Sequence, residues 1–71
     1  MPDEVIIYGK DSCPYTRAAI DDYQGREIPF RYINVKKDKS ELENMLALTR
    51  GKRLVPVIVE GGRITIGFGG T

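Results

Sequence analysis

The order of hydrophobic segments in the first half of the chain restricts what this sequence can fold into. Residues 5–8 (Val-Ile-Ile-Tyr) form a short apolar run rich in β-branched residues, which is typical of a buried central strand. A second run spans residues 30–35, and a helical pattern lies between the two. A strand, a helix and a strand in this order pair in parallel through a right-handed crossover. The first half therefore predicts a β-α-β unit.

Both predicted helices have recognisable ends. Pro14 suits the first position of the first helix, and Gly25 suits its C-terminal end. Residues 40–43 (Ser-Glu-Leu-Glu) fit a capping box, which predicts that a second helix begins there. Gly51 is expected to close that helix.

The last part of the chain predicts an antiparallel hairpin. Two strand-like runs, 57–60 and 63–66, flank Gly61-Gly62, and a Gly-Gly pair between such runs is a strong hairpin signal. The full order becomes β-α-β-α-β-β, which predicts a mixed four-stranded sheet flanked by two helices. All 71 residues are expected to form one α/β domain.

Composition excludes several classes of protein. One cysteine and no histidine leave neither an internal disulfide nor a self-contained Cys/His zinc site to support the core. A net charge of +1 gives no long-range field for nucleic acid, so we expect no nucleic-acid partner. There is no signal-peptide pattern and no apolar run long enough for a membrane span. We therefore expect a cytoplasmic protein without a membrane partner.

Cys13 lies between the first strand and the first helix, a position that favours a reactive thiol. The first turn of a helix has unpaired N–H groups and partial positive charge, which stabilise a thiolate. Such positions lower a cysteine pKa from about 8.5 to between roughly 3.5 and 7.5. Lys10 adds a positive charge nearby. The alternative is a small buried hydrophobe, but the flanking Asp11, Ser12 and Pro14 are typical of a turn.

Three segments together resemble glutaredoxins. Residues 8–16 (Tyr-Gly-Lys-Asp-Ser-Cys-Pro-Tyr-Thr) look like the active-site segment of that family, which contains Cys-Pro-Tyr-Cys. Residues 51–56 (Gly-Lys-Arg-Leu-Val-Pro) resemble Gly-Gln-Arg-Thr-Val-Pro, whose proline is cis and faces the active cysteine. Residues 61–69 resemble the last hairpin and its glycine turn, and the spacing from Pro56 to Gly67-Phe68 is closer to that of glutaredoxin-like redoxins that serve ribonucleotide reductase. The resemblance implies a thioredoxin-like fold without the final family helix.

The resemblance also implies an enzyme, a monothiol glutathione-disulfide oxidoreductase that acts through Cys13. Cys13 would form a mixed disulfide with a glutathionylated protein or small molecule, and glutathione, the co-substrate, would release it. No metal is required. Val55, ahead of a cis-Pro56, would offer its backbone to an extended substrate. The other residues assigned to substrate binding are Lys10, Pro14, Tyr15, Thr16, Lys52, Gly67, Phe68 and Gly69.

For several of these residues an ordinary structural role stays open. Lys10 and Lys52 either receive the glycine carboxylate of glutathione or are solvated lysines. Tyr15 either flanks the tripeptide or is a half-buried residue of the first helix. The remaining surface expectations are an exposed Arg53 and an ion pair between Arg17 and Asp21 at i,i+4 spacing.

The sequence departs from the family pattern in three places. Thr16 replaces the second cysteine, and its hydroxyl either bonds the sulfur of Cys13 or is a small first-turn group. Residues 67–71 carry no carboxylate for the γ-glutamyl end, although the amides of Gly69 and Gly70 are suited to an anion-binding nest. The sequence contains no final helix, so we expect a homodimer across the uncovered sheet face, or small residues on it.

Two other functions stay open on the sequence. Single-thiol glutaredoxins also carry an iron–sulfur cluster, held by one cysteine and one glutathione from each of two subunits. Those members have Cys-Gly-Phe-Ser and an additional loop before the cysteine, which this chain lacks. A thiol donor to one protein partner is the third reading. Some glutaredoxin-like proteins have selenocysteine at the reactive position, and the sequence leaves open whether Cys13 is the thiol form of such a line.

Overall fold

The computed structural model describes residues 4–68, and its elements follow the predicted order. The strands form one sheet in the order β2-β1-β3-β4. Within it, β1 is parallel to β2 and antiparallel to β3, and β4 is antiparallel to β3. The predicted mixed four-stranded sheet is confirmed. The elements are β1 (Val5–Gly9), α1 (Pro14–Gly25), β2 (Phe30–Asn34), α2 (Lys39–Thr49), β3 (Val57–Glu60) and β4 (Arg63–Ile66).

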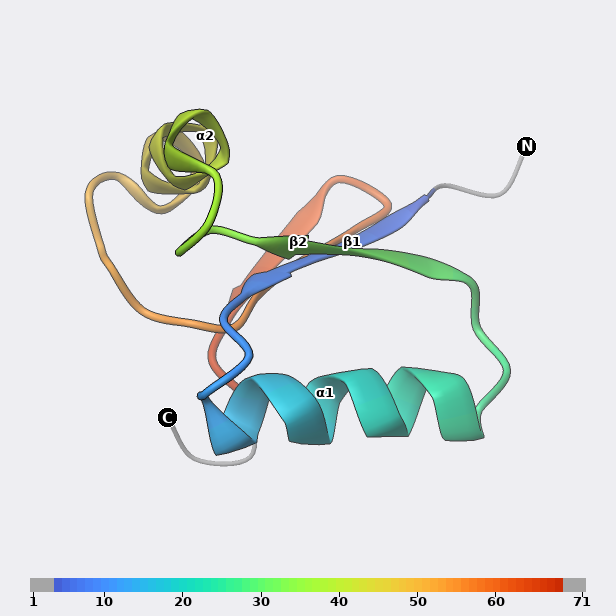
Figure 1. Ribbon diagram of the computed structural model, residues 1–71. Coiled ribbons are helices and arrows are strands. Elements are labelled where there is room, and N and C mark those ends of the chain that lie inside the picture. Colours follow the sequence, from blue (N-terminus) through green and yellow to red (C-terminus); the bar gives the residue numbers. More distant parts are fainter. Residues whose placement is uncertain (1–3, 69–71) are drawn as a thin grey trace.

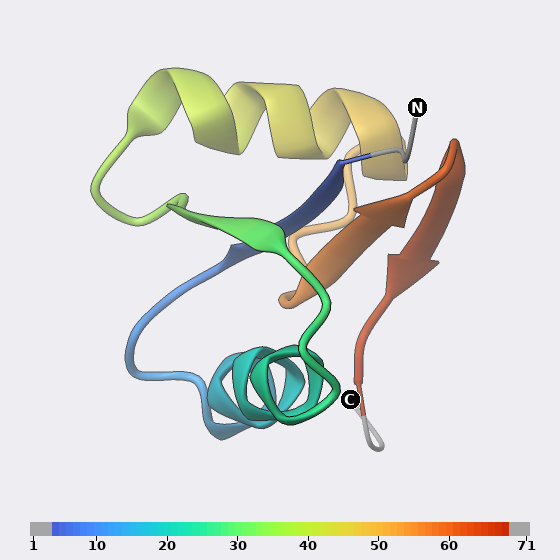
Figure 2. The ribbon, with the colours of Figure 1, turned by 90° about the vertical axis from the view of Figure 1, so that its right-hand side faces the viewer.

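The sheet lies between the two helices, with α1 on one face and α2 on the other (Figure 1). Figure 2 shows the β3–β4 hairpin at one edge of the sheet and β2 at the other. Because side chains alternate along a strand, β1 sends Ile7 toward α1 and Tyr8 toward α2. The buried residues are Val5, Ile7, Ala19, Tyr23 and Ile58 on the α1 side, and Tyr8, Val35, Met45 and Val57 on the α2 side.

The N-terminus of α2 differs from the sequence prediction. The N-cap is Asp38, not Ser40, and its carboxylate accepts hydrogen bonds from the backbone N–H groups of Ser40 and Glu41 at 3.1 and 3.2 Å. The Ser40 hydroxyl donates to the same oxygen at 2.8 Å. The hydrogen bond from the Ser40 side chain, followed by those from the backbone, lowers the pKa of Asp38. A carboxylate satisfies these N–H groups better than a hydroxyl because its charge also complements the helix dipole.

The C-terminal ends of α1 and α2 agree only in part with the sequence prediction. Gly25 is the last residue of α1 in an ordinary conformation, and Arg26 is its C-cap. At the end of α2 the C-cap is Arg50, with a left-handed φ of 59°, and Gly51 follows at 88°. The N–H of Gly51 donates to the carbonyl of Leu46 at 2.8 Å, which closes the helix near the predicted residue.

The predicted ion pair between Arg17 and Asp21 does not form. Instead Arg26 pairs with Asp22 at 2.6 Å, and the Arg26 guanidinium also lies 4.7 Å from the centre of the Tyr23 ring. Arg17 lies near Tyr32 of β2, where its charge acts on that phenol. The i,i+4 spacing is the same in both pairs, but only the pair in the last turn forms.

The sheet face beside α1 is less apolar than the sequence suggested. On that side of the hairpin, Ile58 is buried, and Phe68 packs against the same core cluster. The β4 residues of this face, Arg63 and Thr65, are exposed and polar. The described β4 residues of this face are therefore polar, and the homodimer across the uncovered sheet face stays a prediction. Neither helix within residues 4–68 is long and apolar enough to cross a membrane.

Replacement of Asp38 by alanine should lower the midpoint of thermal unfolding, because two backbone N–H groups of α2 lose their acceptor. Since the pKa of Asp38 is lowered in the fold, this stabilisation is present at neutral pH and is lost as pH falls through that lowered pKa. Thermal melts followed by circular dichroism at neutral and acidic pH measure both effects. Glu43→Ala is the control, because Glu43 belongs to the predicted capping box but not to the observed cap. Equal effects of the two substitutions at neutral pH would contradict the Asp38 cap.

Candidate functional site

Cys13 is the N-cap residue of α1, at the point where the chain leaves the central strand β1. Its backbone is extended, with φ −88° and ψ 116°, and Pro14 occupies the first position of the helix. The N–H of Cys13 donates to the carbonyl of Lys10 at 3.1 Å, which closes the turn between β1 and α1. The side chain is only 8% exposed. The sulfur is therefore held at the start of a helix, beside its unpaired N–H groups.

The surroundings of Cys13 favour the thiolate. Burial by itself would raise the pKa of the thiol, but hydrogen bonds from the Thr16 hydroxyl and from the backbone N–H groups of Thr16 and Tyr15 lower it. The charge of Lys10 lowers it further, and the net result is a lowered pKa. In the protonated form, the S–H group faces the carbonyl of Val55 at 3.9 Å. The direction of this pKa change is the one predicted from the position of Cys13 at a helix start.

Thr16 is fully buried, and while Cys13 is protonated its hydroxyl has no hydrogen-bond partner within residues 4–68; the ionised sulfur of Cys13 is the partner that lowers the pKa of the thiol. An unpaired buried hydroxyl is unfavourable, so this group gains most from a nearby atom that becomes a strong acceptor. The ionised sulfur of Cys13 is such an atom, since a thiolate accepts the O–H that the neutral thiol leaves unused. Thr16 therefore stabilises the charged form of Cys13 selectively.

Gly9, the last residue of β1, makes room for Thr16. A Cβ atom on Gly9 would overlap the Cγ2 atom of Thr16 and lie 2.6 Å from its hydroxyl oxygen. No side chain larger than hydrogen fits between the end of β1 and the first turn of α1 unless Thr16 moves. The sequence does not indicate this contact, because it depends on how α1 packs on β1.

A hydrogen bond fixes the loop before Cys13. The hydroxyl of Tyr32, on β2, donates to the carboxylate of Asp11 at 2.7 Å. Burial and then this bond raise the pKa of Tyr32, so the phenol stays protonated. The parallel pairing of β1 with β2 brings these two residues together, and nothing in their sequence spacing indicates it.

The second segment of the family resemblance, residues 51–56, reaches Cys13 through the carbonyl of Val55. The peptide bond between Val55 and Pro56 is cis, and Pro56 is buried. The carbonyl of Pro56 accepts the N–H of Gly67 at 2.7 Å, which ties the end of the hairpin to the site. Gly67 has a φ of 90°, and Phe68 is half-buried against the α1-side core. Gly69, also predicted for the site, lies outside the described residues.

A hollow of about 260 Å³ lies on the α2 side of the sheet and is lined in part by Val55, whose carbonyl faces the sulfur of Cys13. It brings together Lys10 and Val55, both predicted, with Arg53, which was expected only to be exposed. Lys36 also lines it and was not singled out in the sequence, although it follows the strand parallel to β1. Lys52 does not line it. Its backbone carbonyl accepts the Thr49 hydroxyl at 2.7 Å, and its side chain is exposed.

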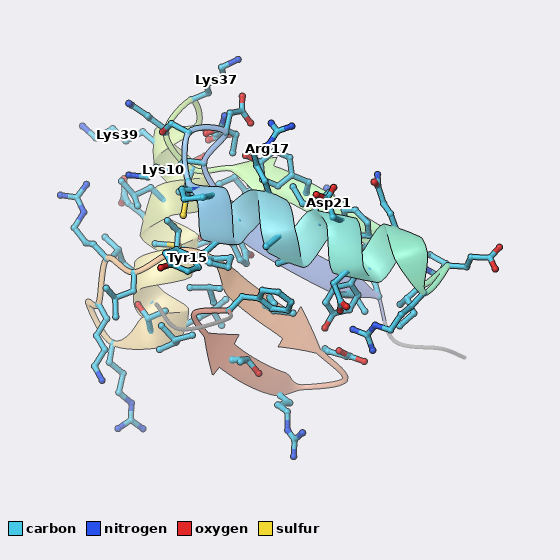
Figure 3. All side chains as sticks on the ribbon, turned by 90° about the horizontal axis from the view of Figure 1, so that it is seen from below. Lys10, Tyr15, Arg17, Asp21, Lys37 and Lys39 are labelled. Atoms are coloured by element: carbon cyan, nitrogen blue, oxygen red, sulfur yellow. The ribbon has the colours of Figure 1, made fainter. Side chains whose placement is uncertain are left out.

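The other predicted contacts are at the surface. Tyr15 is 41% exposed and lies next to Cys13 at the start of α1 (Figure 3). Pro14 is exposed as well. A larger hollow, of about 530 Å³, lies at the opposite end of β1 and holds no nucleophile among its lining residues. Within residues 4–68, no three side chains of the His, Cys, Asp or Glu type converge as a metal site.

The Thr16→Val variant should raise the pKa of Cys13 and slow its alkylation at neutral pH by up to about tenfold, because the thiolate loses a hydroxyl donor. Thr16→Ser keeps the hydroxyl and should retain most of the reactivity. Ultraviolet absorbance of the thiolate against pH and the rate of iodoacetamide modification measure the two effects. A Thr16→Val protein with the wild-type titration curve would contradict this role.

Gly9→Ala should destabilise the fold by about 1–3 kcal/mol, because the added methyl group displaces Thr16 from a packed site. It should also raise the pKa of Cys13, since the displaced hydroxyl no longer reaches the sulfur. Gly25→Ala is the matched control, because a Cβ there meets no atom within 4 Å. Denaturant unfolding and the thiolate titration are the measurements, and wild-type behaviour of Gly9→Ala in both would contradict the packing argument.

Comparison with known proteins agrees with this geometry. The family model for glutaredoxin matches residues 5–65. A glutaredoxin-like 8.6 kDa protein from the rubredoxin operon of Clostridium pasteurianum is 34% identical over 64 residues, covering 90% of this chain and 84% of that protein. Both matches include the segments that surround Cys13.

Two solved structures share the fold closely. Glutaredoxin from Archaeoglobus fulgidus has a TM-score of 0.82 and 26% identity, covering 96% of this chain and 77% of that one. The glutaredoxin-like NrdH-redoxin of Escherichia coli has a TM-score of 0.83 and 27% identity, covering 93% and 84%. The activity profile of that redoxin is described as thioredoxin-like.

Proposed function

The chain belongs to the glutaredoxin family of thiol oxidoreductases with a thioredoxin fold, and we propose that it is a monothiol member that reduces mixed disulfides through Cys13. The observation that supports this most is Cys13 itself, a thiol at a helix start with a lowered pKa. Glutathione is the proposed co-substrate. The cytoplasm is the proposed compartment, because a lone thiol stays reduced there.

The proposed cycle has two exchange steps. In the first, the Cys13 thiolate attacks the glutathione sulfur of a mixed disulfide, the old S–S bond breaks, and the substrate leaves as a thiolate that takes a proton from water. In the second, a glutathione thiolate attacks the new mixed disulfide on Cys13. Glutathione disulfide leaves and the Cys13 thiolate is restored. One glutathione thiol is consumed for each mixed disulfide reduced, and the other half of the glutathione disulfide comes from that mixed disulfide.

The surrounding residues have distinct proposed roles in these steps. The Thr16 hydroxyl and the N–H groups of Tyr15 and Thr16 hold the negative charge on sulfur before attack and when Cys13 leaves. The backbone of Val55 pairs with the extended substrate, in the manner of an added strand. Lys10 contributes charge near the sulfur. Additional proposed contacts are Pro14, Pro56, Gly67 and Phe68.

Thr16 stands where the family motif has its second cysteine, so the proposed chemistry uses one thiol. The chain has a single cysteine, so a mixed disulfide on Cys13 has no internal thiol to resolve it. An external thiol must therefore complete each turnover. The similarity to NrdH-redoxin favours a second candidate, in which Cys13 reduces one protein partner directly and glutathione has no role.

Reduced protein should turn over the mixed disulfide of glutathione and 2-mercaptoethanol, and intact mass spectrometry should show a transient glutathione adduct. Cys13→Ser should abolish both, whereas Ser12→Ala, which removes a neighbouring exposed hydroxyl, should retain activity. Because the pKa of Cys13 is lowered, the rate of adduct formation should fall only as pH falls through that lowered value.

Three other results would overturn parts of this proposal. A failure to form any adduct near neutral pH would exclude the reactive thiolate. Adduct formation without release by glutathione would favour the protein-specific thiol donor. Visible absorbance after reconstitution with iron, sulfide and glutathione, in place of turnover, would favour a cluster carrier.

A further inference from the structure

We propose that Tyr32 is a positioning residue for Cys13, because its hydrogen bond to Asp11 holds the turn that presents the sulfur at the start of α1. The hydroxyl of Tyr32 donates to the carboxylate of Asp11 at 2.7 Å, two residues before the thiol. The inference rests on the proposed function, since it concerns the geometry of the thiol that performs the exchange. It gives a residue of β2, outside the active-site segment, a role in that reaction.

The turn between β1 and α1, residues 10–13, is held by backbone hydrogen bonds only at its ends. The last carbonyl of β1 accepts the N–H of Val35 at 2.9 Å, and the N–H of Cys13 donates within the turn to the carbonyl of Lys10 at 3.1 Å. The two central residues, 11 and 12, are exposed. Within residues 4–68, the bond from Tyr32 is the one hydrogen bond that ties these two residues to another element. The path of the chain into α1 therefore depends on that bond.

The ring of Tyr32 is a fixed anchor for the turn. Tyr32 pairs in register with Ile7, whose side chain is completely buried, and the Tyr32 ring packs against the core cluster on the α1 side. Burial, followed by the bond to Asp11, raises the pKa of Tyr32, so its hydroxyl remains a donor at neutral pH. A side chain that is already packed loses little conformational freedom when it forms a hydrogen bond. The bond therefore orders the turn rather than the tyrosine.

The charges around the phenol place it close to the reactive sulfur. Besides burial and the hydrogen bond, the thiolate of Cys13 raises the pKa of Tyr32 through its charge. The charge of Arg17 acts on the same phenol in the opposite direction. Arg17 belongs to the start of α1, where its N–H donates to the carbonyl of Cys13 at 3.1 Å, and Lys10 lies at the same end of the helix (Figure 3). The turn, α1 and β2 therefore meet at Tyr32, within reach of the charge on sulfur.

The place of the turn decides how well the thiolate is stabilised. Burial raises the pKa of the Cys13 thiol, whereas hydrogen bonds from Thr16 and Tyr15 and the charge of Lys10 lower it. Lys10 and Cys13 are the two ends of the turn, so a shift of the turn moves the ammonium group and the sulfur relative to the N–H groups of α1. Hydrogen bonds weaken steeply as their alignment is lost. Loss of the Tyr32 bond should therefore make the thiolate less favourable.

Tyr32→Phe removes the hydroxyl and keeps the ring that packs on the core. The thiolate titration of Cys13 should move to higher pH, and alkylation by iodoacetamide at neutral pH should slow by about two- to fivefold. Tyr23→Phe is the matched control, because the Tyr23 hydroxyl also donates to a carboxylate at 2.7 Å, that of Glu60 at the other end of the sheet. It should lower the midpoint of thermal unfolding and leave the titration and the alkylation rate of Cys13 unchanged.

Two substitutions of Asp11 separate the hydrogen bond from the charge. Asp11→Asn and Asp11→Ala both remove the negative charge, but only asparagine keeps an oxygen that accepts the Tyr32 hydroxyl. The Ala variant should therefore be alkylated about two- to fivefold more slowly than the Asn variant. When each is combined with Tyr32→Phe, the two should react at the same rate, because the bond that distinguishes them is gone. Exchange with the mixed disulfide of glutathione and 2-mercaptoethanol should follow the same order of rates.

Three results would overturn the positioning role of Tyr32. They are a wild-type titration of Cys13 in Tyr32→Phe, equal alkylation rates of the two Asp11 variants while Tyr32 is present, and an equal loss of reactivity in Tyr23→Phe, which would indicate general loosening of the fold. Iodoacetamide needs no disulfide substrate, so these measurements test the inference separately from the proposed function. A wild-type protein that is alkylated readily but exchanges with no disulfide would refute the proposed function alone.

Discussion

The pairing of β1 on both of its edges determines where the rest of the molecule lies. β1 is hydrogen-bonded to β2 on one side and to β3 on the other, and Ile7 at its centre is completely buried. Its end at Gly9 is therefore fixed, and the short turn that follows can place Cys13 in only one region of the molecule. The same pairing carries the segment before β3 to that region, so the Val55 carbonyl meets a sulfur 42 residues away in sequence.

Much of this arrangement could be predicted from the sequence. The strand-like runs and the Gly-Gly turn determine the element order because hydrophobic periodicity and turn chemistry are local properties. The position of Cys13 at a helix start follows from the strand-like run and turn residues before it and from Pro14 after it. The N-cap of α2 could not be settled in this way, because Asp38 and Ser40 are both good capping residues and only the chain direction before the helix selects one. The hollow was also missed, since Lys36 and Arg53 meet only after β2 and the segment before β3 pack around α2.

The contact between Gly9 and Thr16 links the fold to the chemistry. In the related active-site motif a second cysteine occupies the place of Thr16, and here a buried hydroxyl stands there, without a partner within residues 4–68 while Cys13 is protonated. The close approach of α1 to β1 holds that hydroxyl near the sulfur. The close packing of Gly9 against Thr16 therefore keeps the Thr16 hydroxyl where it lowers the pKa of Cys13.

The single thiol has a consequence for how oxidation is stored. A protein with two neighbouring thiols can keep two oxidising equivalents as an internal bond and remain a separate molecule. This chain has one cysteine, so every disulfide that it forms joins it to something else. Its disulfide-bonded state is always a conjugate, and the fraction of protein in that state follows the ratio of disulfides to thiols in the solution around it.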